Sequence, residues 1–167
     1  MDITADQIKA LRKLTGAGIM DCKRALEQAS GNLDEAQIVL REKGLSSAEK
    51  KASRITEEGL VESYIHSGGR LGAIIEVNCE TDFVARTPEF KTLAHNLAMQ
   101  VAAMAPSYVD STDIPEDVEA SPQEVSLLQQ PFIKDQTMTV QDILKETISK
   151  MGENVKVRRF TRFSLGE

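Results

Sequence analysis

Two carboxylates, Glu80 and Asp82, stand beside the aromatic Phe83 where a strand-like run of the sequence ends. Paired carboxylates are a common arrangement for general acid–base catalysis. Here both lie in one short turn, and the sequence around them indicates no substrate pocket. The turn is more typical of binding, because polar and aromatic residues between regular elements commonly contact another molecule. We therefore expect no catalytic residue here and no enzyme activity.

Phe83 and Asp82 have two interpretations from the residues alone. In the first, Phe83 packs into the core beneath the turn and Asp82 is an ordinary turn-forming residue. In the second, Phe83 is an apolar wedge and Asp82 is a charged contact for another protein. The local pattern does not decide between the two.

A second group of candidate residues lies in the run 14–23, Leu-Thr-Gly-Ala-Gly-Ile-Met-Asp-Cys-Lys. Gly16 and Gly18 supply the backbone freedom that a hinge between two helices needs. In that interpretation Ile19 and Met20 are core residues, because apolar side chains beside such glycines often only pack.

A basic and aromatic run, Lys-Val-Arg-Arg-Phe-Thr-Arg-Phe, occupies 156–163. Such interleaving could bind single-stranded nucleic acid through phosphate contacts and base stacking. It is also typical of an edge strand whose charged side chains prevent strand-to-strand aggregation. The formal net charge of −6 over 167 residues favours the edge strand, because nucleic-acid binders are commonly basic.

Several kinds of site are missing from the sequence. It contains no GxxxxGK[ST] phosphate loop, no GxSxG and no HExxH. Its two cysteines, Cys22 and Cys79, are 57 positions apart, which indicates neither a zinc site nor a disulfide framework. We expect no metal and no cofactor. Without a long apolar run or a signal-peptide pattern, we expect a soluble cytoplasmic protein with free, buried thiols.

The first part of the chain predicts three short helices. Capping-box patterns begin at 4–7 and again at 32–35, and Gly44 is the expected last C-cap. We expect a module over 1–45 that resembles the ubiquitin-associated (UBA) type of three-helix domain. A charged, partly helical linker is expected over 46–58.

The rest of the chain, 59–167, predicts an α+β core. The expected elements, in order, are strands over 60–66 and 71–79, helices over 88–105 and 140–151, and a strand over 154–165. This order favours a small antiparallel sheet with helices packed on one face. The acidic stretch 107–133 is expected to be a long connection with one short helix near 124–128.

The run Thr81-Asp82-Phe83-Val84 resembles the signature of translation elongation factor Ts, the nucleotide-exchange factor for elongation factor Tu. The run 14–23 is similar to the amino-terminal motif of that family. The resemblance implies that residues 81–84 enter elongation factor Tu near its Mg²⁺ site and promote GDP release. It also implies that the three-helix module docks on the nucleotide domain of that partner. The implied contacts in the module are Leu11, Arg12, Thr15, Gly16, Ile19 and Met20.

The length of the chain indicates a short form of the family. Long members carry two core halves and a coiled-coil insertion, whereas this sequence has one core half and no heptad segment. It resembles the short bacterial and plastid forms in which two copies complete the core, so we expect a homodimer. The other expected partner is elongation factor Tu, GDP-bound or nucleotide-free, in the cytoplasm or plastid stroma. Nucleic acid and membranes are not expected partners.

Two other classes of protein stay open. In an adaptor, the three-helix module would bind a ubiquitin-like or helical partner and the core would only support it. In an RNA-binding protein, the basic strand would carry the function, with steep salt dependence. The run 81–84 has no use in either class, so a non-enzymatic exchange factor is the leading hypothesis.

Overall fold

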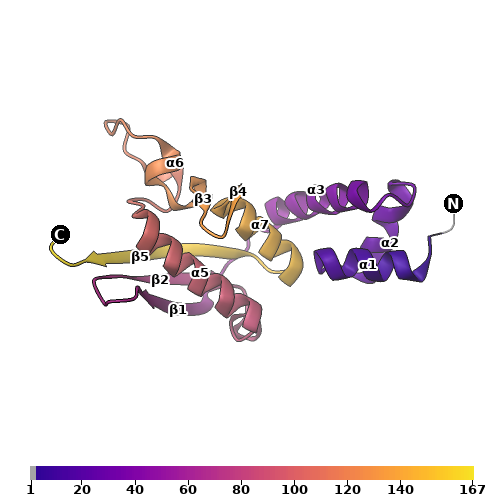
Figure 1. Cartoon of the computed structure of the whole chain (residues 1–167), viewed down its shortest axis with the longest axis horizontal. Coiled ribbons are helices and arrows are strands. Elements are labelled where there is room, and N and C mark those ends of the chain that lie inside the picture. The colour runs from indigo at the N-terminus through magenta and orange to yellow at the C-terminus, as the bar shows by residue number, and fades with distance from the viewer. Residues whose placement is uncertain (1–2) are drawn as a thin grey trace. The chain divides into compact units, whose positions relative to one another are not determined.

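The computed structural model describes residues 3–167, which form two compact units. The helical unit holds the described part of Met1–Lys51 together with Lys145–Gly152, and the sheet unit holds Ala52–Leu144 and Glu153–Glu167 (Figure 1). The helices are α1 (Ala5–Thr15), α2 (Ile19–Gln28), α3 (Leu33–Lys51), α4 (Asp82–Ala85), α5 (Pro88–Met104), α6 (Pro122–Val125) and α7 (Val140–Met151). The strands are β1 (Glu58–Ile65), β2 (Leu71–Cys79), β3 (Pro131–Phe132), β4 (Asp135–Thr139) and β5 (Val155–Ser164).

Local capping signals set the ends of the first helices. Thr4 and Gln7 form a complete capping box at the start of α1, and Gly16 ends that helix in the left-handed region at φ +69°. The Asn32 side chain accepts the backbone N–H of Glu35 at 3.3 Å at the start of α3. The small core of this module consists of Leu11, Cys22, Ala25, Leu26, Ala29 and Ala36.

The third helix does not end at Gly44, so the C-cap expected there is wrong. Helix α3 continues to Lys51 and Gly44 is buried within it. A Cβ at this position would come within 2.8 Å of the Ser149 hydroxyl oxygen in the last turns of α7. Gly44 therefore permits close packing of two helices of the helical unit, and the helix tolerates the glycine because the packing compensates for its low propensity.

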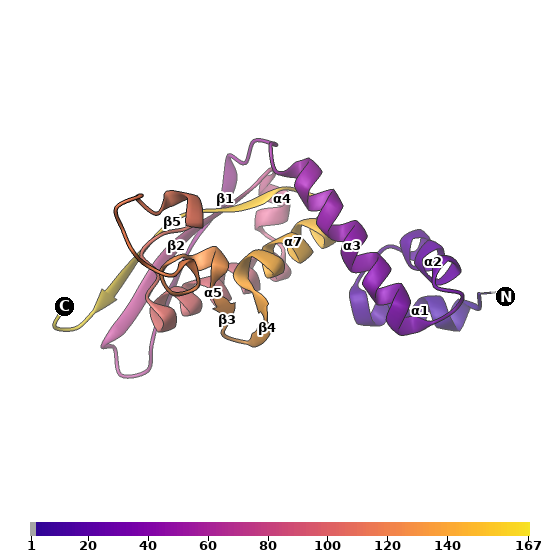
Figure 2. The same ribbon diagram turned by 90° about the horizontal axis from the view of Figure 1, so that it is seen from above.

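The sheet unit has the expected α+β architecture. The strand order is β1-β2-β5, and both neighbouring pairs are antiparallel. On β2, alternate residues from Ala73 to Cys79 are buried beneath α5, which packs against all three strands (Figure 2). Thr87 caps α5 and Pro88 occupies its first turn, which agrees with the helix predicted from residue 88 onward. Helices on one face of a small antiparallel sheet confirm the predicted fold class.

The opposite face of this sheet carries large apolar side chains that are exposed in the sheet unit. We call it the open sheet face and define it by Val61, Ile65, Ile74, Phe163 and Leu165. Their exposed fractions range from 46% for Ile74 to 67% for Val61 and Phe163. The face runs from β1 across β2 to the end of β5, and a shallow hollow lies among Ile65, Ile74, Phe163 and Leu165.

The stretch 107–133 contains more regular secondary structure than the sequence predicts. The expected helix near 124–128 is replaced by α6 and a short 3-10 helix, Leu127–Gln129, and the hairpin β3–β4 was not predicted at all. Two fully buried glutamines, Gln100 and Gln130, fasten the ends of this stretch. The Gln130 amide donates to the Met104 carbonyl at 3.3 Å and to the Glu124 carbonyl at 2.9 Å. The Gln100 amide oxygen accepts the Ile133 N–H at 2.8 Å.

None of the helices among residues 3–167 is long and apolar enough to cross a membrane.

Candidate functional site

The residues 81–84, which we call the tip, leave the end of β2 as the start of a one-turn helix. Thr81 is the N-cap of α4, and its hydroxyl oxygen accepts the Val84 N–H at 3.4 Å. Phe83 is 79% exposed, which rules out the interpretation in which it packs beneath the turn. Val84 is only 6% exposed, so it anchors the tip while Asp82 and Phe83 face solvent. An exposed phenylalanine on a well-anchored turn is a ready contact for another protein.

Asp82 has an ion-pair partner on the same short helix. Its carboxylate lies 2.9 Å from the Arg86 guanidinium, and both side chains are exposed. An ion pair this exposed is weak, because water and salt screen it. Asp82 can therefore exchange Arg86 for a partner's polar group at little cost.

Glu80 belongs to the scaffold beneath the tip rather than to an acid–base pair. Its carboxylate accepts the Asn154 N–H at 2.7 Å and lies 3.4 Å from the Arg54 guanidinium. Asn154 is 1% exposed, and its amide donates in turn to the carbonyls of Ala52 and Arg54. These contacts join three segments that are distant in sequence, so Glu80 is engaged in structure and is unavailable as a proton-transfer partner for Asp82.

Cys79, the last residue of β2, is completely buried beside the tip. Its thiol donates to the Thr81 carbonyl at 3.1 Å. Burial, and then the negative charge of Glu153, raise the pKa of the Cys79 thiol to about 11 from an ordinary 9.0. The fold therefore favours the neutral thiol. Its contribution to the free energy of unfolding is fully present below pH 9 and is lost as the pH rises from 9 toward 11.

We expect Cys79 to react with iodoacetamide at pH 8 about a hundredfold more slowly in the folded than in the urea-unfolded protein. The reason is that the raised pKa lowers the fraction of Cys79 present as thiolate by about that factor. A Cys22→Ala background leaves Cys79 as the only thiol, and mass spectrometry follows the modification. Equal rates in the two states would contradict the buried, protonated thiol.

The candidate contacts of the helical module divide into surface and core. Ile19 and Met20 are 54% and 61% exposed, so the interpretation of both as core residues is wrong. Leu14, three residues after the buried Leu11 on the same helix, is 64% exposed and joins this surface. Leu11 is fully buried and can act only by supporting its neighbours.

The other candidates in the module lie at the end of α1. Arg12 is exposed and Thr15 is half-buried. The Thr15 hydroxyl donates to the Leu11 carbonyl at 2.8 Å and accepts the Ala17 N–H at 3.3 Å, so it shapes the turn. Gly16 is exposed and is required by its positive φ, which a residue with a Cβ rarely adopts.

Asp21 ties the second helix to the third. One oxygen of its carboxylate lies 2.6 Å from the Lys43 ammonium and 2.8 Å from the Arg24 guanidinium. These hydrogen bonds, that from Lys43 first, lower the pKa of Asp21. Asp21 is therefore a structural residue that holds α2, with Ile19 and Met20 at its start.

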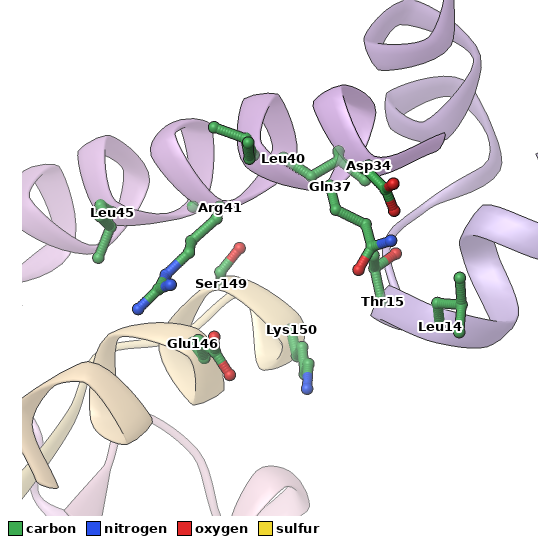
Figure 3. Close-up of a pocket in the computed structure, with 12 residues that line it drawn as sticks. Leu14, Thr15, Asp34, Gln37, Leu40, Arg41, Leu45, Glu146, Ser149 and Lys150 are labelled. Carbon is green, nitrogen blue, oxygen red and sulfur yellow. The ribbon is translucent and has the colours of Figure 1, made fainter. Parts of the chain in front are cut away.

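The helical unit also contains an open hollow of about 510 Å³ (Figure 3). Helix α1 contributes Leu14 and Thr15, and α3 contributes most of the remaining wall. Glu146, Ser149 and Lys150 of α7 complete it. The lining mixes apolar side chains with charges of both signs, so it indicates no single class of ligand.

The basic strand β5 does not present a free row of cations. Arg159 and Arg158 lie 2.8 Å and 3.8 Å from opposite oxygens of the Glu76 carboxylate. Arg162 donates to the Ala102 carbonyl at 3.0 Å and pairs with Glu167. Hydrogen bonding, from Asn78 and then from Arg159, lowers the pKa of Glu76. Strand β5 lies at an edge of the three-stranded sheet, as the edge-strand interpretation expects.

Among residues 3–167, no cluster of three or more histidine, cysteine or acidic side chains could hold a metal ion.

Known proteins resemble the chain along its whole length. The sequence profile of the family described as Elongation factor TS matches residues 4–123 and 117–167. A protein of Carboxydothermus hydrogenoformans named Elongation factor Ts is 49% identical, with 99% of this chain and 90% of that protein aligned. Proteins of the same name from Moorella thermoacetica and Coprothermobacter proteolyticus are 48% and 46% identical; the alignments cover 96% and 100% of their lengths.

The alignments with these relatives have more positions than this chain has residues. The alignment with the Carboxydothermus protein has 195 positions, against 167 residues here, so at least 28 aligned positions have no residue in this chain. The two profile matches overlap at 117–123, within the stretch that the buried glutamines enclose.

Proposed function

Since this chain belongs to the elongation factor Ts family, we propose that it promotes GDP release from elongation factor Tu during translation elongation. The observation that carries the proposal is Phe83, a large apolar side chain that is 79% exposed on a one-turn helix at the end of a strand. Leaving such a side chain in water is unfavourable unless a partner buries it. The tip is thus shaped for insertion into another protein.

The proposed mechanism is a difference in affinity between two states of the partner. GDP is held in part by Mg²⁺ and by the loop around its phosphates, where the ion is a large local charge. If Phe83 enters only when those contacts are disturbed, binding of the tip weakens binding of GDP. Linkage requires GDP to weaken binding of the tip by the same factor. No covalent bond forms, so the chain acts without enzymatic chemistry.

The helical module supplies a second proposed contact. Leu14, Ile19 and Met20 form an exposed apolar group around the glycine turn, with Arg12 on the same module. Apolar anchors beside a cation are typical of protein interfaces. We assign this group to docking on the nucleotide domain of elongation factor Tu, with Thr15 and Gly16 shaping the turn.

We further propose that the chain acts as a homodimer in the cytoplasm. The open sheet face carries five exposed apolar side chains, and a second copy related by a twofold axis can cover them with its own matching face. Because the chain carries a formal net charge of −6, nucleic acid is not a proposed partner.

The direct test measures release of a fluorescent GDP analogue from elongation factor Tu in a stopped-flow instrument. We expect the full chain to accelerate release by at least about tenfold at saturating concentration, since a coupling of about 1.4 kcal/mol already gives that factor. An adaptor would bind elongation factor Tu, or another protein, without changing the rate. Unchanged release at saturating concentration would therefore overturn the proposal and favour the adaptor.

A further inference from the structure

The tip is fastened to the rest of the sheet unit by Glu153, which lies in the turn between α7 and β5. One oxygen of its carboxylate accepts the backbone N–H groups of Glu80 at 3.1 Å and Thr81 at 3.0 Å. The other oxygen accepts the Thr81 hydroxyl at 2.6 Å. Glu153 is half-buried and more than 70 residues away in sequence, so these three bonds bring distant segments together. Charge-assisted hydrogen bonds of this kind are stronger than neutral ones.

The Thr81 hydroxyl that bonds Glu153 also caps α4, the helix that carries Phe83. Because the hydroxyl donates to Glu153, its lone pairs are left to accept, and they accept the Val84 N–H at the start of α4. Helix α4 has four residues, too few to be stable alone. The orientation of α4 therefore depends on its N-cap, Thr81, and the orientation of the Thr81 side chain depends on Glu153.

A second bond in the reverse direction makes the connection reciprocal. Glu80, just before the tip, accepts the N–H of Asn154, just after Glu153, at 2.7 Å. Each segment thus supplies a carboxylate to the backbone of the other. The pair of bonds restrains both translation and rotation of the tip relative to β5.

We propose that Glu153 is a positioning residue for nucleotide exchange: it holds the tip so that Phe83 is presented in one orientation. This inference rests on the proposed function, because it assumes that Phe83 is the acting group. A wedge that can swing away would lose its effect on the partner, since misplacement by about 1 Å is enough to lower a rate strongly. Glu153 itself need not touch elongation factor Tu.

The experiment compares full-length Glu153→Ala with the parent in the GDP-release assay. We expect the rate at saturating concentration to fall at least about tenfold, with the half-saturating concentration changed less than about twofold, because the docking module is untouched. Glu153→Gln keeps the side-chain length and an oxygen acceptor, so it should recover most of the lost rate. Equal losses in the alanine and glutamine variants would overturn positioning through hydrogen bonds.

Asp142→Ala is the matched control. The Asp142 carboxylate also accepts a backbone N–H in the sheet unit, that of Thr139 at 3.0 Å, at the start of α7. The Asp142→Ala variant should lower the melting temperature, as Glu153→Ala does, but it should leave the saturating rate of GDP release near that of the parent. Parallel losses of rate and stability in both variants would assign Glu153 a merely structural role.

A double variant separates action through Phe83 from a general effect. In a Phe83→Ala background, Glu153→Ala should change the saturating rate less than about twofold. A full, independent loss in that background would overturn the proposal.

Amide hydrogen exchange tests the same inference without the partner. The Val84 N–H should exchange at least about tenfold faster in Glu153→Ala than in the parent or in Asp142→Ala. If the parent fails to accelerate GDP release, the proposed function is wrong, and this measurement still decides whether Glu153 holds the tip. Unchanged protection of Val84 would overturn the positioning role.

Discussion

Replacing Phe83 with alanine is expected to lower the saturating rate of GDP release from elongation factor Tu about 10- to 100-fold. Burying a phenylalanine side chain contributes about 1.5–3 kcal/mol, and each 1.4 kcal/mol corresponds to a factor of ten. The ring is 79% exposed in the free protein, so its removal leaves no cavity and should not unfold the chain. The measurement is the stopped-flow rate as a function of the concentration of the chain.

Two further variants locate the effect. Val118→Ala removes an apolar side chain that is 37% exposed outside both proposed contact surfaces, and it should leave the rate unchanged. Met20→Ala should raise the half-saturating concentration while sparing the saturating rate, because it weakens docking and not the wedge. If Phe83→Ala behaves like Met20→Ala, Phe83 contributes only affinity and the wedge mechanism is wrong.

Replacing Phe163 with glutamate is expected to convert a dimer into a monomer. Phe163 is 67% exposed on the open sheet face, and in the proposed dimer a second copy buries it. A carboxylate there would be desolvated against apolar side chains such as Ile65 and Ile74, which is strongly unfavourable. Light scattering at micromolar concentration should give twice the chain mass for the parent and one chain mass for the variant.

Two further variants separate the effect of an added negative charge from the effect of its position on the open sheet face. Val118→Glu adds the same charge away from the sheet and should leave the parent's mass unchanged. Ile65→Glu tests a second position on the same face and should behave as Phe163→Glu does. Because both residues are exposed in the single chain, circular dichroism should show that the variants stay folded. A monomeric parent would contradict the homodimer outright.

Local capping chemistry made much of the fold predictable. Thr4 with Gln7, and Thr87 with Pro88, identify helix starts because the partners are close in sequence. Alternation along β2 likewise predicts which face is buried. The family signature at 81–84 located the candidate tip, although its exposure could not be known from a single sequence.

Features that depend on distant partners were not predictable. Gly44 looks like a helix end, but its role depends on Ser149, which is more than 100 residues away. Leu14 follows the helical spacing of Leu11, yet it is 64% exposed and lines the open hollow of the helical unit. The bonds of Glu153 to the tip are of the same kind, because nothing near Glu153 in sequence indicates what its carboxylate accepts.

The buried glutamine pair makes this chain a convenient host for inserted sequence. Gln100 and Gln130 close the base of the stretch they enclose, so its ends stay together whatever its middle contains. For a loop whose ends are held, each doubling in length costs only about 0.6 kcal/mol. The exposed residues near 117–119 lie in the middle of this stretch and therefore form an entry point for an epitope or a fluorescent reporter. Such a reporter would leave the tip, the docking module and the open sheet face in their native sequence.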